Sequence, residues 1–417
     1  MKKFLSMLAI AAMVTSFMAC DDDDDGGVTP DDLKPVKVMS GVIGTQTWSN
    51  DSIYELAGRV IVGDGATLTI EPGTVIKGRE GQGISASALM IARGGKINAV
   101  GTADEPIIMT SVLDDIMPGE TAGTTLDEDD RGKWGGLVIL GKAPISVSGA
   151  TEAQIEGVPA GEVLGLYGGD VANDNSGTIK YVSIRHGGTV ISGGNEINGL
   201  TLGGVGTGTT ISDIEIFGNI DDGVEFFGGT VNVKNILITY QGDDGIDIDQ
   251  AYSGTVDGFL VIHGGDNTDK GLEIDGPEGT ANATGKFVLK NGTLKGDPTK
   301  SGDVSNPADF KSKAQGTLEN VLFTGYTAGK NIIIAASYDG SCASTSNAYK
   351  NLVDGNLVFT TVQFTGYTVD VYASSGSCDT ADDDTTAAGL VTSTTATGSP
   401  AVSTWGWTVS AEKSLLD

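Results

Sequence analysis

The sequence predicts an all-β protein that is wound as a parallel β-helix, a solenoid with coils of 21–26 residues. Three observations favour this fold. The chain contains 63 glycines and only 6% aromatic residues, which suits short strands joined by many turns. No long helical pattern interrupts it, and short alternating segments recur at a nearly fixed period. A repeat of this length is typical of a solenoid.

The clearest repeat has the form Gly-φ-x-φ, in which φ is an apolar residue. It occurs four times, at spacings of 24, 22 and 26 residues, in Gly199–Leu202, Gly223–Phe226, Gly245–Ile248 and Gly271–Ile274. A second short alternating strand precedes each copy. Alternation puts both φ residues on one face of a strand. Strands this short cannot bury that face alone, but stacked repeats form a continuous core.

An earlier repeat is less regular. Leu68–Ile70, Leu89–Ile91 and Leu137–Ile139 are each followed, six residues later, by a further isoleucine. The first shift is 21 residues and the second is 48, with an acidic insertion at 114–130 taking up the excess. Leucine-rich repeats would need an Asn or Cys ladder and a helical segment, and a β-sandwich would need longer strands without a period. The β-helix is therefore the favoured fold.

The N-terminus has the features of a signal peptide. Lys2 and Lys3 precede an apolar run, Phe4–Val14, that is shorter than the roughly 20 residues of a membrane-spanning helix. Ala19 and Cys20 end a segment that resembles a lipobox, in which a small residue suits the peptidase and the thiol carries the lipid. We expect residues 1–19 to be a lipoprotein signal peptide. The alternative is an ordinary secretory signal with a coincidental cysteine.

Residues 20–40 are expected to form an acidic tether. The run Asp21–Asp25 indicates a solvated linker. It also resembles the export signal of surface lipoproteins of Bacteroidota, which implies an outer-membrane lipoprotein exposed on the cell surface; periplasmic retention is the alternative. We expect the β-helix to span residues 41–373. Residues 374–417 would form a Ser/Thr/Asp-rich segment and a C-terminal cap, with Trp405 and Trp407 closing the open end of the coil.

Charge and cysteine content limit the partners. The formal net charge is −30, and loss of residues 1–19 would make it −32, because Lys2 and Lys3 are removed and no acid is. Nucleic acid is excluded as a partner, since phosphate binding needs a basic surface. An anionic partner would need bridging metal ions. Cys342 and Cys378 are expected to form a disulfide in an oxidising compartment.

Several segments carry a family resemblance. Residues 68–78 (LTIEPGTVIKG), 134–145 (WGGLVILGKAPI) and 241–249 (QGDDGIDID) resemble the right-handed β-helix lipoproteins of Bacteroidota, which belong to the pectin-lyase-like class. The resemblance covers roughly residues 41–330. It implies a right-handed coil. It implies little about activity, because that class includes lyases, hydrolases and non-catalytic binders.

Acidic residues gather at one repeat position. Pairs of aspartates end the turns before Gly223 and Gly245, so they should stack on adjacent coils about 4.8 Å apart. The middle residues Glu225, Asp247 and Glu273 should form a second, outward-facing column. Such carboxylates repel one another, which makes calcium a candidate ligand. The metal-binding candidates are Asp221, Asp222, Asp243, Asp244 and Asp247. The favoured interpretation is that aspartate simply serves as a turn former before glycine, and a metal site is the alternative.

A catalytic interpretation rests on a second resemblance. Polygalacturonase-type hydrolases place one Asp on a coil, an Asp pair on the next and a His on the one after. Asp222, the pair Asp243 and Asp244, and His263 have comparable spacing and would be the catalytic residues. The Arg-x-Lys substrate clamp of those enzymes has no match here, because KFVLKNG stands on the following coil. Other basic candidates are sparse: Arg185, Lys270 and Lys286. The favoured interpretation of His263 and His186, which both precede Gly-Gly, is that they are corner residues.

The favoured function is therefore a non-catalytic, surface-anchored binding or adhesion module. Its partner would be a glycan or a cell-surface protein, and calcium is the one cofactor that the sequence suggests. A polysaccharide lyase or glycoside hydrolase acting on acidic polysaccharide is the first alternative. A structural spacer in an outer-membrane complex is the second.

Overall fold

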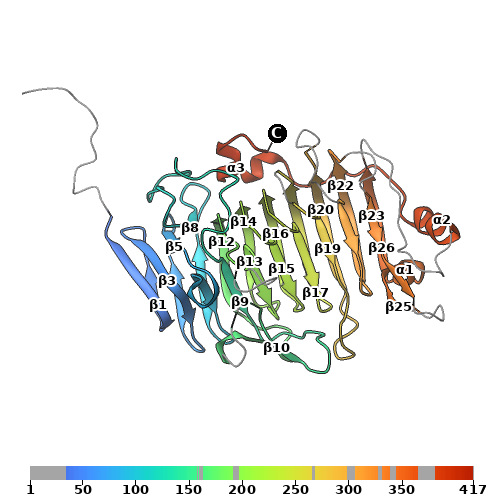
Figure 1. Ribbon diagram of the computed structural model, residues 1–417, viewed down its shortest axis with the longest axis horizontal. Coiled ribbons are helices and arrows are strands. Elements are labelled where there is room, and N and C mark those ends of the chain that lie inside the picture. The colour runs from blue at the N-terminus through green and yellow to red at the C-terminus, as the bar shows by residue number, and fades with distance from the viewer. Residues whose placement is uncertain are drawn as a thin grey trace, which may run out of the picture. The chain divides into compact units, whose positions relative to one another are not determined.

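The computed structural model describes residues 34–156, 158, 163–190, 197–264, 268–297, 306–326, 331–338, 344–364 and 381–416. Within these ranges the chain forms a right-handed parallel β-helix, whose strands make a 22-stranded sheet (Figure 1). The fold predicted from the sequence is thus confirmed. The predicted signal peptide, Cys20 and the run Asp21–Asp25 lie outside the described residues, as do Cys342 and Cys378.

The strands stack in three ladders, which we call A, B and C in the order in which each coil passes through them. Seven long strands run through ladder C and then ladder A: β12 (Gly177–Arg185), β14 (Thr210–Phe217), β16 (Asn232–Thr239), β18 (Thr255–Ile262), β20 (Phe287–Lys295), β22 (Gly316–Thr324) and β26 (Leu357–Phe364). Short strands begin ladder C: β2 (Gln46–Trp48), β4 (Thr67–Ile70) and β7 (Lys96–Val100). Ladder A includes β5 (Val75–Gly78) and β8 (Ile107–Ser111).

Ladder B contains the Gly-φ-x-φ repeats. Its short strands are β6 (Ala88–Ile91), β9 (Leu137–Leu140), β13 (Leu200–Gly203), β15 (Val224–Phe227), β17 (Ile246–Asp249), β19 (Leu272–Ile274), β21 (Ala308–Phe310) and β23 (Ile332–Ile334). At the N-terminal end, β1 (Val36–Ile43) and β3 (Ile53–Val62) run through both ladder A and ladder B.

The long strands bend where the backbone turns left-handed. Positive φ angles occur at Asp213, Asn235, Asn291 and Asn320, among others. Aspartate and asparagine adopt this conformation more readily than other side chains. Their side chains also bind one another: Asn235 Nδ2 donates to Asp213 Oδ1 at 2.9 Å, and Asn320 Nδ2 donates to Asn291 Oδ1 at 2.8 Å. Side-chain hydrogen bonds therefore join successive coils at the corner between ladders C and A.

The repeat predicted for ladder B is observed in register. Val224 pairs with Ile246, and Ile246 pairs with Leu272. Ile246 and Ile248 are 0% and 1% exposed, whereas Asp247 between them points outward and is half-buried. Not every coil has 21–26 residues, because Leu272 pairs with Ala308, 36 residues further on. Insertions in the turns lengthen such coils without disturbing the strand register.

The earlier repeat was aligned wrongly in its first step. Leu68 lies in ladder C and pairs with Ile97, whereas Leu89 lies in ladder B and pairs with Val60. The predicted shift of 21 residues therefore joined two different faces of the coil. The shift of 48 was correct, because Leu89 pairs with Leu137. All three ladders use the same apolar alternation, so the pattern alone does not identify the ladder.

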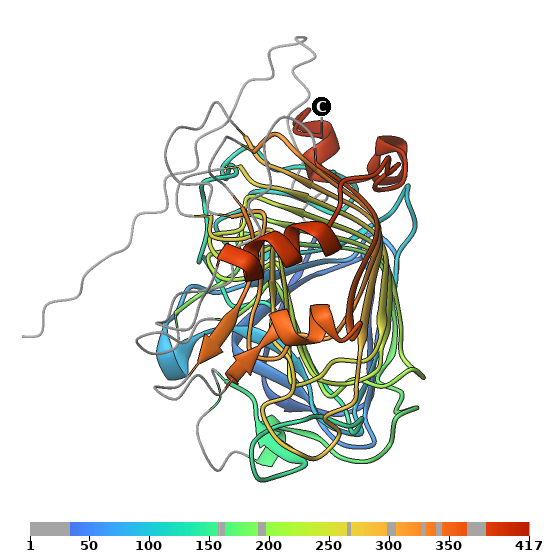
Figure 2. The same ribbon diagram turned by 90° about the vertical axis from the view of Figure 1, so that its right-hand side faces the viewer.

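The C-terminal end of the coil is covered by two short helices. α1 (Ala348–Val353) and α2 (Ala381–Leu390) lie across that end when it is viewed along the coil (Figure 2). Leu352 and Ala387 from these helices belong to the central apolar core. Among the described residues no helix is long and apolar enough to span a membrane. The sequence pattern did not predict these helices.

Trp405 and Trp407 do not close the open end, so that prediction is wrong. Both belong to the short segment from η4 (Val402–Trp405) to α3 (Val409–Glu412), which lies along the side of the coil (Figure 1). Trp405 packs against Leu237 and Leu260, and Trp407 meets the ring of Tyr181 edge-on. These partners are outward-facing side chains of the long strands. The sequence repeat did not indicate which segment of the chain packs against them.

Smaller elements complete the described chain. They are η2 (Gly83–Ser85), η3 (Val163–Gly165), the antiparallel pair β10 (Glu152–Gln154) and β11 (Leu166–Gly168), and the antiparallel pair β24 (Ala336–Tyr338) and β25 (Ser344–Asn347). The coil starts earlier than predicted, because Val36 of β1 already pairs with Ile53. Residues 36–40 therefore belong to the coil and not to the tether.

Candidate functional site

A column of carboxylates runs along the outer surface of ladder B. Glu225 pairs with Asp247, Asp247 with Glu273, and Glu273 with Asp309. Neighbouring strands lie about 4.8 Å apart, so the four side chains are close neighbours on four successive coils. The first three were predicted to stack in this way. Asp309 was missed because Pro307 stands where the earlier repeats have glycine, although Ala308–Phe310 keeps the φ-x-φ form.

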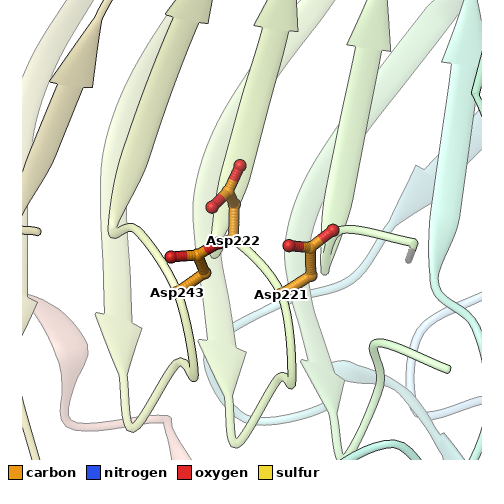
Figure 3. Close-up of side chains that lie close together, drawn as sticks. All are labelled: Asp221, Asp222 and Asp243. Atoms are coloured by element: carbon orange, nitrogen blue, oxygen red, sulfur yellow. The ribbon is translucent and has the colours of Figure 1, made fainter. Parts of the chain in front are cut away.

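The turn aspartates bind the backbone of the next coil. Asp222 Oδ1 accepts a hydrogen bond from the Asp244 N–H at 2.9 Å, and Asp244 Oδ1 accepts one from the Lys270 N–H at 2.6 Å. Asp222 and Asp244 are 6% and 4% exposed. These two residues therefore do shape the turns, as the favoured interpretation of the sequence predicts. Asp221 and Asp243 are more exposed, and Figure 3 shows both of them close to Asp222.

The first three residues of the column and the turn residues form one continuous surface, which we call the acidic ridge. Its carboxylates form four groups of three whose ligand oxygens lie within 4.8 Å of one another. The ridge consists of Asp221, Asp222, Glu225, Asp243, Asp244, Asp247, Asp269 and Glu273. All five residues predicted as metal ligands belong to it. Glu225, Asp269 and Glu273 extend the predicted ligand set.

One end of the ridge carries its own positive charges. Lys270 Nζ lies 2.6 Å from Asp269 Oδ2 and 2.7 Å from Glu273 Oε2. Lys311 forms ion pairs with Glu273 and with Asp275. Burial alone would raise the pKa of Glu273, but hydrogen bonds from the two lysines bring that pKa below its ordinary value. This end is therefore electrostatically satisfied.

The other end has no such partner. Asp222, Glu225 and Asp247 form what we call the uncompensated cluster, because in the described part of the chain none of them forms an ion pair with Lys or Arg. Burial, followed by the charge of neighbouring carboxylates, raises the pKa of all three well above the ordinary value. Asp247 Oδ1 is inaccessible to solvent and has no hydrogen-bond partner among the described residues.

Asn198 lies at the edge of this cluster. Its Nδ2 donates to Glu225 Oε2 at 2.6 Å, and its Oδ1 is buried without a hydrogen-bond partner in the described structure. Asn198 comes from the preceding coil, directly before Gly199, in the position that Asp222 occupies before Gly223. Carboxylate and amide oxygens are the ligands that calcium prefers. The cluster thus has the donor set of a hard-cation site.

Raised pKa values extend beyond the uncompensated cluster. Burial, with a smaller contribution from Glu273, raises the pKa of Asp244 to about 8. Burial and the charge of Asp275 raise the pKa of Asp249 to about 7. Burial likewise raises the pKa of Asp309 to about 6. Acids of the ridge and beside it therefore hold protons near neutral pH, and a cation bound by the ridge would displace those of its own ligands.

The model of the pectate-lyase like beta helix domain matches residues 41–409. The chain belongs to this family. A pectin methylesterase from Aspergillus niger is similar in two solved forms. The penultimately deglycosylated form is 12% identical with a TM-score of 0.28, covering 87% of this chain and 88% of that one. The deglycosylated form is 11% identical with a TM-score of 0.29, covering 84% and 87%. Comparison with curated proteins gives no match.

In this β-helix domain His263, the histidine of the catalytic interpretation, lies away from solvent. His263 is fully buried, and its Nε2 lies 3.2 Å from Tyr326 Oη. Its Nδ1 has no hydrogen-bond partner in the described structure, so neither ring nitrogen binds a carboxylate. Burial lowers the pKa of His263 to about 3. The structure therefore groups Asp222, Asp243 and Asp244 but leaves His263 in the interior, as expected for a corner residue.

The second histidine and the basic candidates also have structural partners. His186 is buried at a positive φ, with its Nδ1 2.7 Å from the Asp130 carbonyl oxygen. Arg185 is buried beside Glu215, and Lys286 donates to Asn356 Oδ1. Only Lys270 of the predicted basic residues reaches the acidic ridge.

Proposed function

We propose that this β-helix domain is a non-catalytic binding module that holds calcium in the uncompensated cluster. The metal would in turn bind an extended glycan or a cell-surface partner along ladder B. One observation carries the proposal: the carboxylates of Asp222, Glu225 and Asp247 converge on two adjacent coils, and none of them forms an ion pair with Lys or Arg among the described residues. In a chain of net charge −30, an anionic partner also requires a bridging cation.

Electrostatics favours a bound ion over an empty cluster. Two carboxylates at the strand spacing repel by about 3.5 kcal/mol at an effective dielectric constant of 20. Either protons or a cation must offset this repulsion. Calcium takes six to eight oxygen ligands, some of them from water. Among the described residues, Asp247 Oδ1, one of the cluster carboxylate oxygens, and Asn198 Oδ1 are both buried without a hydrogen-bond partner, so both could serve as ligands.

We also propose that the mature protein is an outer-membrane lipoprotein of a member of the Bacteroidota, anchored through acylated Cys20 and exposed on the cell surface. Support comes from the short apolar run after Lys2 and Lys3, the lipobox-like segment ending in Cys20, and the acidic run that follows it. An acylated anchor would place the binding module at the cell envelope, where calcium and glycans are both available.

The anchor gives a first prediction. Cys20→Ala should prevent lipid attachment, so the protein should be recovered uncleaved or in the soluble fraction. Changing Asp21–Asp25 to alanine should leave the lipid in place but move the protein from the surface to the periplasm. Protease treatment of intact cells is the measurement. Protein that remains accessible to protease after the second change would show that the acidic run is not an export signal.

The enzymatic alternative has one observation in its favour. With a pKa of about 8, Asp244 would be protonated at neutral pH beside the exposed Asp243. An acid and an ionised carboxylate are the pair that glycoside hydrolysis needs. The second alternative, a rigid spacer, requires no ligand at all. The variants Asp247→Asn and Asp244→Asn distinguish all three functions.

A second prediction separates these functions. Calcium at 100 times its dissociation constant should stabilise the wild-type protein by about 2.7 kcal/mol, and Asp247→Asn should remove at least about half of that gain. Asp309→Asn, in the same column but outside the four groups, is the matched control and should leave the gain unchanged. Thermal unfolding with calcium or with EDTA is the measurement, and cleavage of pectin or alginate is assayed in parallel.

Three outcomes are distinct. Calcium-dependent stabilisation without cleavage supports the binding module. Cleavage that disappears in Asp244→Asn would establish a hydrolase or lyase instead. Neither calcium binding nor cleavage would favour the structural spacer.

A further inference from the structure

A second carboxylate cradle lies one coil beyond the uncompensated cluster, and a lysine fills it. The Lys270 ammonium lies 2.6 Å from Asp269 Oδ2, 2.7 Å from Glu273 Oε2 and 4.0 Å from Asp244 Oδ1. Asp244 and Asp269 belong to one group of converging ligand oxygens, and Asp244 and Glu273 belong to another. The lysine nitrogen thus occupies the place of a cation among three carboxylates.

The position of Lys270 in the repeat explains how it reaches the cradle. It stands directly before Gly271, where Asp222 stands before Gly223 and Asp244 before Gly245. The strands that follow these glycines pair in register, so the three residues occupy equivalent places on successive coils. One repeat position therefore carries a carboxylate on two coils and an ammonium on the third.

The carboxylates of the cradle stabilise the charge of the lysine. Burial alone would lower the pKa of Lys270, but the nearby carboxylates of Asp244, Asp269 and Glu273 outweigh burial and raise it. The side chain is only 15% exposed, so it lies within the ridge and does not extend into solvent. An ion that is tethered to the chain gives up little translational freedom on binding, which favours it over a free ion of equal charge.

We infer that Lys270 is a tethered counter-ion that occupies a second cation cradle and so restricts the acidic ridge to a single divalent cation. This inference deepens the calcium site proposed above. It assigns Lys270 a role in setting how many metal ions the ridge binds, which is separate from any contact with a glycan or a cell-surface partner. It also implies that the ridge would gain a second metal if the ammonium were removed while the three carboxylates remained.

The test is the number of metal ions bound by Lys270→Met, measured by titrating the full mature chain with calcium and with terbium. The wild-type protein should bind one ion and Lys270→Met two. Lys270→Arg keeps the charge and should still bind one. Lys290→Met is the matched control: Lys290 forms an ion pair with Asp257 outside the ridge, and its loss should leave the number at one. An unchanged number in Lys270→Met would overturn the inference.

The result also distinguishes this inference from the proposed function. Zero ions in the wild type and one in Lys270→Met would refute the calcium site but support the tethered counter-ion. One ion in the wild type and one in Lys270→Met would support the calcium site but refute the tethered counter-ion. If Lys270→Met unfolds in EDTA, refolding in saturating calcium supports the inference, because a metal then replaces the ammonium. A variant that no amount of calcium refolds would contradict it.

Discussion

Replacing Ile246 with alanine is expected to lower the free energy of unfolding by about 2–5 kcal/mol, the usual range for a large-to-small change in a core. Ile246 is completely buried and lies between Val224 and Leu272 on the neighbouring coils. Each of those residues is held by its own strand pairing, so the stack has little freedom to collapse into the cavity. Ile248→Ala should have an effect of the same size. Denaturant unfolding followed by circular dichroism measures both.

Asp247→Asn is the matched control, because Asp247 lies between the two isoleucines on the same strand. In EDTA this change should be neutral or slightly stabilising, since it relieves repulsion within the uncompensated cluster. If Asp247→Asn destabilised the calcium-free protein as much as Ile246→Ala, the assignment of inward and outward faces on ladder B would be wrong.

Glu215→Ala is expected to lower the free energy of unfolding by about 3–5 kcal/mol, because it leaves a buried charge without its partner. Glu215 is completely buried; its Oε2 lies 3.9 Å from Arg185 Nη2 and accepts a hydrogen bond from Ser183 Oγ. Its Oε1 accepts hydrogen bonds from the Ser410 N–H at 2.9 Å and from Ser410 Oγ at 2.7 Å. Glu215 thus fixes α3 to the side of the coil and compensates Arg185.

Ser410→Ala provides the comparison for Glu215→Ala. It removes the hydroxyl contacts but keeps the ion pair and the backbone hydrogen bond, so it should lower stability by only about 0.5–1.5 kcal/mol. Limited proteolysis should release residues 401–416 faster from Glu215→Ala than from Ser410→Ala. Equal stability and equal proteolysis of the two variants would show that the buried ion pair is not what holds the C-terminal segment.

The main features of the fold were predictable because strand alternation records burial directly. Val224, Ile246 and Leu272 stand at equivalent places in the sequence repeat and pair in the structure. The placement of a strand in a particular ladder was less predictable, as Leu68 shows, because every face of the coil uses the same alternation. The path of the C-terminal segment depends on apolar side chains on the outside of distant coils, such as Leu237 and Leu260, which no local pattern links to Trp405.

The candidate site was predictable in position but not in environment. The columns of carboxylates follow from the repeat, but the sequence predicted only that the second column faces outward. Glu225 is in fact only 7% exposed, and Asn198 from the previous coil binds it. The role of Lys270 was equally hidden, because a single lysine among aspartates at one repeat position has no distinct sequence signal. Burial and counter-charge both depend on segments that come together only in the folded chain.

The raised pKa values fix the sign of the pH dependence. Asp222, Glu225 and Asp247 hold protons more tightly in the folded chain than in the unfolded chain. Without calcium, their contribution to stability is therefore present at acidic pH and is lost as the pH rises through their folded pKa values. Calcium must displace these protons, so its affinity should increase with pH.

Calorimetric titration of the calcium-free protein tests the proposed site most directly. At pH 8 the wild-type chain should bind one calcium ion and release protons, and the affinity should fall as the pH is lowered to 6. Asp247→Asn should bind at least tenfold more weakly, which corresponds to about 1.4 kcal/mol. A wild-type protein that binds no calcium at any pH in this range, or that binds it equally well after Asp247→Asn, would contradict the assignment of the uncompensated cluster as a metal site.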